Sequence, residues 1–535
     1  MQHYHSLFYK SSSFAKYIIL GLLLFITNSC LKEDFNVKNV GLNNNSPGLA
    51  IPLINSSLDI RDVYNLDTAG WALKEDNSKF LSLIYMKTET FGADSFLRIS
   101  NQSLKKQKYI FNIGVSLPLG DSTSDIYISN LDFISSDNDI YDTLYIKSGT
   151  LDITISSTLN MRGKMIFSLP EVTKGGKMLV SQINYPGNPN NNINLAIDLT
   201  GYKIVFLHQA NTNIITTVCK VMAYNDGKKN NSPYDVSLSV NLNDIKFNKL
   251  FGYFNSRKFN FFDFLSISLF GGIKRGDSYI EDPSLKLLIQ NSVGIPVKFD
   301  ILSFTSHSDI KTPHDLNITG LPNTINIGSP SKPGLTTQKS YLLDKTNSNI
   351  KDAINLSPTG FLFNVNGTTM PVPTIENFIF DTSKINLNLE IDLPLFGWLR
   401  NYVLQDTFDF SIGKLDIFES LTFNLLADNG FPLEASLQLY FLDSKNKITD
   451  SMFVNPKDLI RSGITEITTG KVIKPVSRLY TVVFDRKKLD MIVNCKKMLI
   501  EASLYTSKLG KNSIKIYSDY SIDIKLSALA KLKIN

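Results

Sequence analysis

The chain has 535 residues, of which 43% are hydrophobic and 19% are charged, and its formal net charge is +6. This composition is typical of ordered globular proteins and excludes a largely disordered chain. At about 150 residues per domain, the length predicts three or four domains. So small a positive excess on so long a chain does not indicate a nucleic-acid partner.

The first 29 residues have the order of a secretory signal peptide. Lys10 and Lys16 precede the apolar run Tyr17–Ile26, which is shorter than the roughly 20 residues of a membrane-spanning helix. The residues that follow, ending at Cys30, resemble a bacterial lipobox. That resemblance implies that Cys30 is diacylated, becomes the first residue of the mature protein and attaches it to a membrane. An ordinary signal peptide cleaved nearby is the alternative.

The residues after the cysteine suggest where the protein is sent. Lys32, Glu33 and Asp34 resemble the export signal of surface lipoproteins of the Bacteroidetes type, which implies an outer-membrane protein facing the cell exterior. The alternative is a charged segment that only keeps the start of the chain in water. Residues 30–47 carry no periodic apolar pattern and are expected to form a flexible tether.

The rest of the chain reads as short alternating strands separated by turn residues. This pattern predicts an all-β fold of tandem antiparallel sandwich-like modules, with one short helix in each repeat. A junction recurs after alternating runs at Ser116–Gly120, Leu250–Tyr253 and Asp392–Leu399. We therefore predict an N-terminal half module at 48–119 and three β modules at 120–251, 252–396 and 397–535.

The last two predicted modules share further features in the same order. Each has a turn with Gly before Pro, at Asn291–Val297 and Ala427–Leu433. Each also has apolar residues at helical spacing, and a helix at Ser56–Tyr64 is expected for the half module. The first full module fits less well, because its Asn- and Pro-rich tract Tyr185–Asn192 has no counterpart and its helix is not evident. The repeated features give the length of a module but not the residue at which it begins, so all the boundaries could be shifted along the chain. The residues expected to form the buried faces of the later helices are Ile350, Ala353 and Ile354, and Leu489, Ile492 and Val493.

Catalytic motifs are scarce. The sequence lacks the nucleophile elbow, the phosphate-binding loop, the zinc-protease motif and the Cys-x-x-Cys pair. Only three histidines follow the signal peptide. This scarcity argues against a histidine base, and we predict neither an enzyme nor a cofactor. A glycosidase carboxylate pair leaves no signature in one sequence, and Glu390 or Glu419 could be half of such a pair.

Two clusters offer metal-binding atoms. His307, Asp309, His314 and Asp315 fall within nine residues and combine nitrogen and oxygen donors. The acidic stretch Ser135–Asp142 offers oxygen ligands for calcium, although it lacks the pattern of an EF-hand. A solvated loop and a polar turn are the preferred alternatives, so no metal is predicted at either place.

The two remaining cysteines and one tryptophan are expected to have structural roles. Cys219 and Cys495 could pair, but we expect two buried free thiols. Trp398, at the last junction, is expected to pack two modules together. The sequence therefore predicts a lipid-anchored envelope protein with a non-enzymatic binding or structural role, whose loops contact an unknown protein or glycan. An envelope glycosidase and a β-rich lipid carrier are the alternatives.

Overall fold

The computed structural model describes residues 48–532 apart from 60–70, 96, 114–116, 136, 267–274, 310, 373–376, 410–416, 456 and 467–468. The expected signal peptide, Cys30, the export signal Lys32–Asp34 and the tether lie outside these residues. The strands pair antiparallel in layered sheets, so the predicted all-β sandwich fold is confirmed. None of the helices in the described part of the chain is long and apolar enough to cross a membrane.

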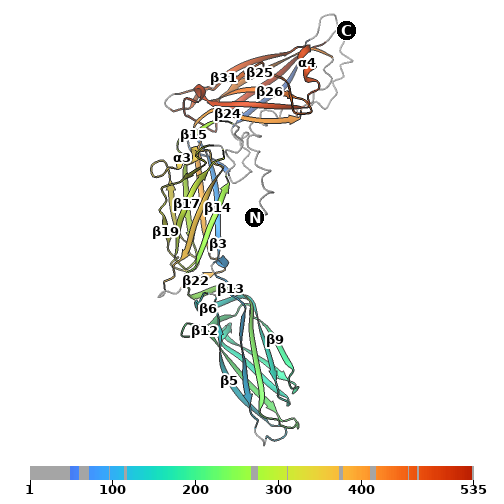
Figure 1. Ribbon diagram of the computed structural model, residues 1–535, viewed down its shortest axis with the longest axis vertical. Coiled ribbons are helices and arrows are strands. Elements are labelled where there is room, and N and C mark those ends of the chain that lie inside the picture. The colour runs from blue at the N-terminus through green and yellow to red at the C-terminus, as the bar shows by residue number, and fades with distance from the viewer. Residues whose placement is uncertain are drawn as a thin grey trace.

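Three β sandwiches lie end to end (Figure 1). We call the one farthest from the chain ends the distal module. Its eight main strands are β4 (Gln102–Phe111), β5 (Ser122–Phe133), β6 (Ile140–Ser157), β7 (Gly163–Lys174), β8 (Lys177–Tyr185), β9 (Asn192–Asp198), β12 (Thr212–Tyr224) and β13 (Tyr234–Tyr253), with the short β10 (Lys203–Val205) and β11 (Leu207–Gln209) before β12.

The middle module follows the same scheme. Its main strands are β3 (Leu81–Gly92), β14 (Lys258–Ser266), β16 (Ser284–Asn291), β17 (Val297–His307), β19 (Thr324–Ile327), β20 (Thr337–Leu343), β21 (Gly360–Thr369) and β23 (Lys384–Pro394). Smaller elements are β2 (Trp71–Glu75), the 3-10 turn η2 (Ala93–Ser95), β18 (Asp315–Asn317), helix α3 (Ile350–Asn355) and β22 (Asn377–Phe380).

The terminal module holds both the first and the last described strands. Its main strands are β1 (Gly48–Asp59), β24 (Phe396–Asp409), β25 (Phe418–Asn429), β26 (Leu433–Leu442), β28 (Lys457–Ile460), β31 (Val476–Phe484), β32 (Lys497–Thr506) and β34 (Ser521–Leu532). Smaller elements are β15 (Arg275–Ile280), β27 (Ile448–Ser451), β29 (Ile464–Thr465), β30 (Val472–Lys474), helix α4 (Arg486–Ile492), helix α5 (Ser507–Gly510) and β33 (Ile514–Lys515).

The main strands pair in the same order in all three modules. Numbered along the chain within a module, the first strand pairs with the eighth, the eighth with the third and the third with the sixth. In the other sheet the second pairs with the seventh, the seventh with the fourth and the fourth with the fifth. This is the strand order of a jelly roll, a sandwich of two Greek keys.

The modules are nested rather than consecutive. The terminal module is interrupted after β1 by the whole middle module, which is itself interrupted after β3 by the distal module. β1 pairs with β34 so that Gly48 faces Lys531, while β3 pairs with β23 and β4 with β13. In Figure 1 the blue β3 therefore lies among the green and yellow strands of the middle module.

This nesting corrects the half module expected at 48–119. Its main strands β1, β3 and β4 are the first strands of three different modules, and Ser56–Asp59, where a helix was expected to begin, belongs to β1. Alternation identifies a strand but not a partner hundreds of residues away, which is why the prediction failed. The other seven strands of each module run over 122–253, 258–394 and 396–532, close to the ranges expected for the three full modules.

Several of the expected local features are observed. Asn291 and Asn429, at the two Gly and Pro turns, are buried and make matching hydrogen bonds. The Asn291 amide donates to the carbonyls of Ile295 and Gly328, and the Asn429 amide donates to those of Leu433 and Arg461. The sequence repeat itself stays a prediction, and these paired turns are the observation in its favour.

Two of the short helices form where helical spacing predicted them. Ile350, Ala353 and Ile354 are buried on α3. Leu489 and Ile492 are buried on α4, whose N-cap Asp485 accepts a hydrogen bond from the Lys488 amide; Val493 instead lies exposed. The distal module has no α-helix among residues 199–211, which join its sixth and seventh strands, so a helix does not recur in every module.

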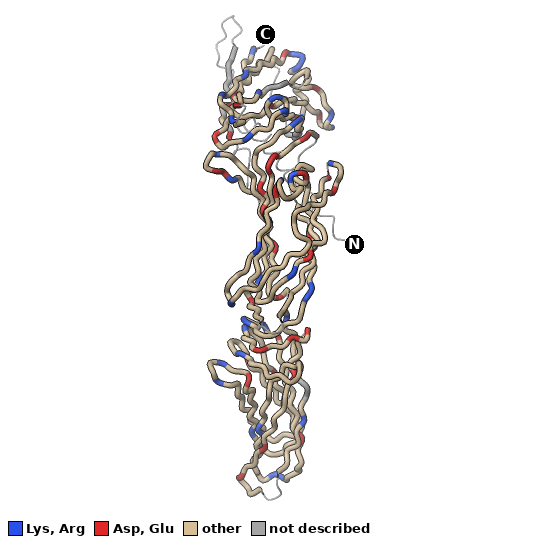
Figure 2. The backbone as a smooth tube through the Cα atoms, turned by 90° about the vertical axis from the view of Figure 1, so that its left-hand side faces the viewer, with Lys and Arg blue, Asp and Glu red and all other residues tan. Residues whose placement is uncertain are grey.

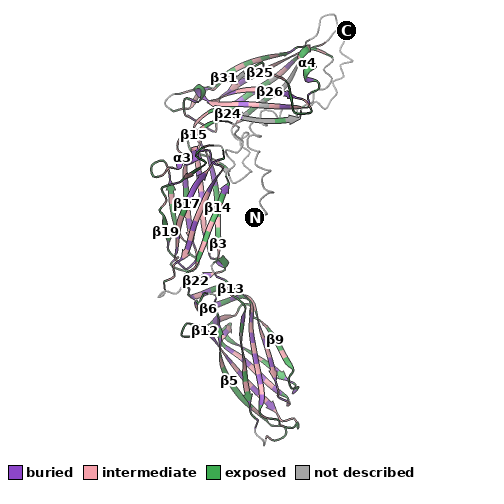
Figure 3. Cartoon of the chain, in the orientation of Figure 1, coloured by how far each residue is buried: buried purple, intermediate pink, exposed green. Residues whose placement is uncertain are grey.

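Buried side chains fill the space between the sheets, and bands of buried and exposed residues alternate along the strands (Figure 3). One apolar cluster continues from the distal module, where it includes Leu144 and Phe167, into the middle module, where it includes Ile289 and Val297. Each such side chain stabilises the fold by about 1.5–3 kcal/mol when fully buried. The distal and middle modules therefore share a core.

The two described cysteines are separate. Cys219 is buried in the distal module and Cys495 in the terminal module, and both are free thiols, as expected. Burial raises the pKa of the Cys219 thiol to about 11, so this thiol is unreactive at neutral pH.

Candidate functional site at the distal tip

Four loops form the end of the distal module that points away from the rest of the molecule (Figure 1). They are residues 112–121, of which 114–116 are not described, and 158–162, 186–191 and 225–233. In the middle and terminal modules the corresponding end holds the next module, because the insertion follows the first strand. The described chain places no module on the distal tip.

A groove of about 520 Å³ lies at this tip and takes residues from all four loops or the strand ends beside them. Its size falls within the roughly 300–1,000 Å³ of typical ligand sites. The lining includes Gly120, Arg162, Asn184, Tyr185, Tyr224 and Asn225.

Hydrogen bonds hold the loops together. The Asn225 side-chain amide donates to the Leu117 carbonyl at 2.7 Å, and the Gly120 amide donates to the Asn225 carbonyl at 2.9 Å. These bonds join the first loop to the fourth. The buried Tyr234 hydroxyl lies 2.8 Å from Asn160 Oδ1 and accepts a hydrogen bond from the Asn231 amide at 2.7 Å, which joins the second loop to the fourth. The tip is therefore organised before any ligand arrives.

The third loop packs closely on the second. Gly187 has a φ of +81°, and a Cβ there would lie 2.7 Å from the Met161 carbonyl carbon, so only glycine fits without displacing backbone. The Tyr185 hydroxyl lies 2.7 Å from the Asn188 carbonyl oxygen. Burial raises the pKa of this tyrosine, so its hydroxyl stays neutral and donates within the tip itself.

Arg162 supplies an exposed cation at the groove. Its side chain is 71% exposed, and its Nε lies 3.7 Å from Asp226 Oδ2, whose side chain is only 9% exposed. Lys228 Nζ approaches the same carboxylate at 4.0 Å. Two cations thus share one carboxylate, which leaves a positive excess beside the groove. A guanidinium in this position suits a carboxylate or phosphate, and the exposed Asn184 amide can both donate to and accept from hydroxyl groups.

The groove offers binding groups rather than catalytic ones. Its described lining residues include no Asp, Glu, His or Cys, the usual acids, bases and nucleophiles. Sequence patterns did not point to Arg162, Asn184 or Tyr224. The one available signal was the Asn- and Pro-rich tract Tyr185–Asn192, which fits no repeat and forms the third loop.

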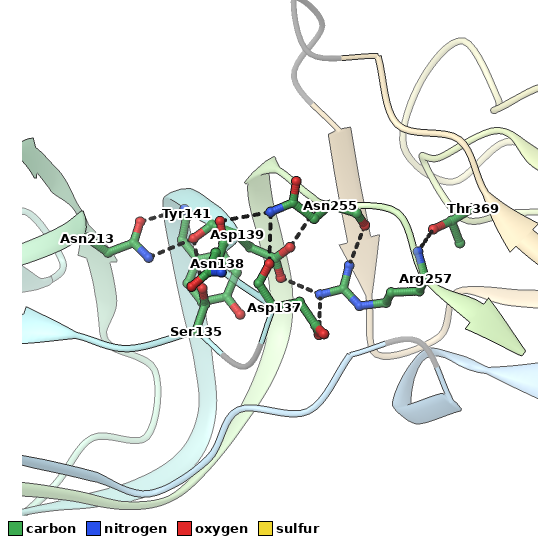
Figure 4. Close-up of polar contacts among 9 residues, drawn as sticks. All are labelled: Ser135, Asp137, Asn138, Asp139, Tyr141, Asn213, Asn255, Arg257 and Thr369. Atoms are coloured by element: carbon green, nitrogen blue, oxygen red, sulfur yellow. Dashed lines mark hydrogen bonds and ion pairs between the residues drawn. The ribbon is translucent and has the colours of Figure 1, made fainter. Parts of the chain in front are cut away.

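The acidic stretch Ser135–Asp142 instead binds a cation of the chain itself (Figure 4). Arg257 Nη2 forms an ion pair with the fully buried Asp139 and lies 3.2 Å from Asp137 Oδ2. The Asn255 amide donates to the other Asp139 oxygen at 2.8 Å. The guanidinium therefore occupies the position where a calcium ion was considered.

This ion pair joins two modules. Asp139 lies between β5 and β6 of the distal module, while Arg257 lies in the link to β14 of the middle module. The Arg257 amide donates to Thr369 Oγ1 at 2.7 Å, and the Thr369 amide donates to the Arg257 carbonyl at 2.9 Å. The Asn213 side chain donates to the Asp139 carbonyl and accepts from the Tyr141 amide. The network in Figure 4 is thus a structural clamp.

The histidine cluster is an ion-pair network in the middle module. His307 Nδ1 lies 2.6 Å from Asp315 Oδ1, and its Nε2 lies 3.3 Å from Asp309 Oδ1. The hydrogen bond with Asp315 is the main cause of a raised His307 pKa. His314 turns away and its Nδ1 contacts the Ser308 carbonyl at 2.8 Å. Within the described residues, no three His, Cys, Asp or Glu side chains are grouped to hold a metal.

Trp398 lies on β24 of the terminal module, next to the junction with the middle module. Its half-buried ring stacks on Tyr279 with 5.5 Å between ring centroids, and the Arg400 guanidinium lies 4.0 Å from the ring centroid. Lys351 of α3, in the middle module, lies 4.8 Å from the Tyr279 ring. Trp398 therefore supports Tyr279, which in turn contacts the middle module through Lys351; direct packing of Trp398 between two modules stays a prediction.

The two carboxylates considered for a glycosidase lie in different modules. Glu390 is on β23 of the middle module and Glu419 is on β25 of the terminal module. Glu419 forms an exposed ion pair with Lys531 at 2.9 Å.

No protein-family model matches the chain, and no curated protein sequence matches it. Among solved structures, a crystal structure of a "putative secreted protein" from Parabacteroides distasonis ATCC 8503 aligns with 10% identity and a TM-score of 0.28, over 52% of this chain and 88% of that one. Infectious bursal disease virus, Gx strain, aligns with 9% identity and a TM-score of 0.13, over 89% and 85%. The VP2 subviral particle of the same virus gives 6% identity and 0.11, over 87% and 84%. TM-scores this low carry no information on function.

Proposed function

We propose that this chain is a lipid-anchored envelope protein that holds a binding surface away from the membrane and catalyses no reaction. The nested topology is the observation that carries the proposal. β1 enters the terminal module beside the end of β34, while the free loops lie at the opposite end of the molecule (Figure 1). A lipid on Cys30 would hold the terminal module near the membrane, and the distal tip would then face outward.

The groove suits a ligand that carries hydroxyl groups and an acid, and an acidic glycan has this chemistry. Arg162 can bind a carboxylate or phosphate through two parallel hydrogen bonds. The Asn184 amide can bind hydroxyl groups, and the ring of the half-buried Tyr224 offers an apolar face. Preorganised loops favour binding because less conformational entropy is lost when the ligand arrives.

Two observations favour binding over the alternative functions. A glycosidase needs two carboxyl groups about 5–9 Å apart, and the described lining of the groove contains none. A lipid carrier needs a large apolar tunnel, whereas the apolar cavity between the sheets of the middle module, lined by Phe261, Leu287 and Phe363 among others, measures about 60 Å³. That volume is far below the roughly 300–1,000 Å³ of typical ligand sites.

The binding surface can be tested with the mature chain made soluble by Cys30→Ser. On an array of acidic and neutral oligosaccharides we expect binding to acidic glycans. Arg162→Ala should weaken it by about 10- to 100-fold, because a charge-assisted hydrogen bond contributes about 1.5–3 kcal/mol. Arg98→Ala is the matched control, since Arg98 is an exposed arginine close to the junction with the middle module. Equal binding by both variants, or cleavage of the glycan, would contradict the proposal.

The anchor is tested separately. Cys30→Ala should move the protein from the membrane fraction to the soluble fraction, because the lipid is the expected attachment. Protease treatment of intact cells should degrade the wild-type protein if it faces outward. Continued membrane association of the alanine variant would refute lipidation of Cys30, and full protection from protease would refute display on the cell surface.

A further inference from the structure

The end of the terminal module that lies away from the middle module gathers several separate segments. Gly48 faces Lys531 and Phe418 faces Leu532 at this end, so the first described strand begins there and the last one ends there. The Arg486 guanidinium at the start of α4 donates to the Phe418 carbonyl at 2.9 Å. We call the surface formed here by residues 417–418, 443–449 and 486–497 the basal surface; α4 marks it in Figure 1.

Contacts bring the hairpin between β26 and β27 against the segment after α4. The Lys496 amide donates to the Leu442 carbonyl at 2.9 Å, and Lys497 faces Leu442 across the sheet. Thr449 Oγ1 lies 2.9 Å from Cys495 Sγ. Two basic stretches that are about 40 residues apart in the sequence therefore share one surface.

The basal surface exposes apolar side chains among lysines. Ile448 is 51% exposed, Met491 43% and Val493 39%. Exposed lysines flank them in both segments. These are Lys445, Lys447, Lys487 and Lys496, and Figure 2 shows Lys and Arg residues near the C-terminal end of the chain.

The acidic residues of this end are already engaged. Asp450 lies 3.7 Å from Lys488 Nζ, and Asp485 caps α4. Asp443 accepts hydrogen bonds from the Lys445 and Lys447 amides, and Asp490 forms an ion pair with Arg486 on α4. Among the described residues, none of the four exposed lysines forms an ion pair within 4.0 Å. Their charges are therefore available to a partner.

We propose that the basal surface lies against a bilayer and binds the phosphate groups of anionic lipids. Exposed apolar side chains beside lysines are the chemistry by which peripheral proteins enter the headgroup region. The inference rests on the proposed function in one respect, namely that Cys30 is lipidated. Cys30 precedes Gly48 by 18 positions, so a fully extended tether reaches at most about 60 Å and begins at this surface. The lipid and the basal surface then act together to orient the molecule.

The test uses the unlipidated mature chain, carrying Cys30→Ser, and flotation with two kinds of vesicle. One kind contains phosphatidylcholine alone and the other contains equal parts of phosphatidylcholine and phosphatidylglycerol. We expect binding to the anionic vesicles only, and weaker binding as salt is added. Combined Lys445→Gln, Lys487→Gln and Lys496→Gln should reduce the partition coefficient about 100-fold, since each lysine near an anionic surface contributes about 1 kcal/mol.

Matched variants separate this surface from the rest of the molecule. Lys177→Gln, Lys229→Gln and Lys246→Gln remove three exposed lysines from the distal module and should leave vesicle binding unchanged. Met491→Ser should weaken binding with the lysines intact, which distinguishes insertion from charge alone. Equal binding to both kinds of vesicle, or equal loss in the basal and distal triple variants, would overturn the proposal. Because neither the lipid on Cys30 nor the tip groove takes part, failure of the proposed function would leave this result interpretable.

Discussion

The molecule has two junctions, one between the distal and middle modules and one between the middle and terminal modules. The backbone connection is the same at both, but different side-chain contacts stabilise them. In each, the segment between the seventh and eighth strands of the outer module pairs with the module inserted into it. β22 pairs with residues 249–252 of β13 at the first junction, and Ile516 and Tyr517 pair with Leu81 and Phe80 at the second.

What differs is how the charged groups are held. At the first junction Asp139 is fully buried and the Arg257 side chain is 11% exposed. At the second, the Lys351 to Glu281 pair at 3.0 Å is 23% and 27% exposed, and the aromatic stack of Tyr279 and Trp398 is half-buried. Loss of one partner of a buried ion pair strongly destabilises the fold, because the other charge stays buried without compensation. In a partly exposed pair, water screens the remaining charge and the loss is smaller. We therefore expect the distal and middle modules to move as one body and the terminal junction to open more readily.

The largest predicted effect follows from Arg257→Leu. This change leaves the Asp139 carboxylate buried without its cation, which should cost about 3–5 kcal/mol. Hydrogen exchange should then accelerate in residues 249–252 of β13 and in β22, while the terminal module stays protected. Chemical denaturation should show an earlier first transition.

The double variant Arg257→Leu with Asp139→Asn provides the control. Removing both charges takes away the uncompensated carboxylate, so much of the lost free energy of unfolding should return. The Asn side chain can still accept the hydrogen bond from the Asn255 amide. If the double variant is as unstable as Arg257→Leu, the ion pair is not what closes this junction.

The sequence predicted much of this local structure and little of the long-range arrangement. Alternation located the strands, and apolar spacing located α3 and α4 with most of their buried residues. It could not show that β1 pairs with β34, because the partners lie more than 460 residues apart and many strands share the same alternation. The nested order therefore emerged only from the structure.

For the functional residues, too, the sequence predicted local features but not the contacts between distant residues. The acidic stretch was recognised as able to bind a cation, but that cation is Arg257, 118 positions from Asp139. A single sequence offers no means of pairing the two. The tip groove likewise collects residues from four loops spread over about a hundred positions, and none of these loops carries a motif of its own.

A smaller effect is expected from Trp398→Ala at the terminal junction. The change removes the stack on Tyr279 and the contact with Arg400, which together contribute about 1–2 kcal/mol. Hydrogen exchange in β15 and β24 should accelerate while residues 249–252 of β13 are unaffected. Acceleration at both junctions would contradict the view that they open independently.

A still smaller effect is expected from Asp137→Asn, which tests the role of burial directly. Asp137 and Asp139 contact the same guanidinium nitrogen, but the Asp137 side chain is 48% exposed and that of Asp139 is fully buried. Asp137→Asn should lower the free energy of unfolding by less than about 1 kcal/mol. Asp139→Asn, measured beside it by the same denaturation, should cost several times more. Equal costs would mean that burial does not determine the strength of the clamp.

The smallest predicted effect is a loosening of the terminal junction at low pH. Burial acts to raise the pKa of Glu281, but hydrogen bonds from Ser513 and Lys351 outweigh it and leave the pKa below the ordinary 4.5. A carboxylate with a lowered pKa stabilises the folded state above its ordinary pKa, and this contribution is lost as the pH falls through the lowered value. Acid should therefore loosen the terminal junction, and the fluorescence of Trp398, which stacks at this junction, should report the change.

Glu281→Gln should loosen the junction at neutral pH and remove this part of the acid response. If the variant and the wild type give the same pH profile, Glu281 does not hold the junction, and the contrast with the buried clamp at Asp139 must lie in the aromatic stack alone.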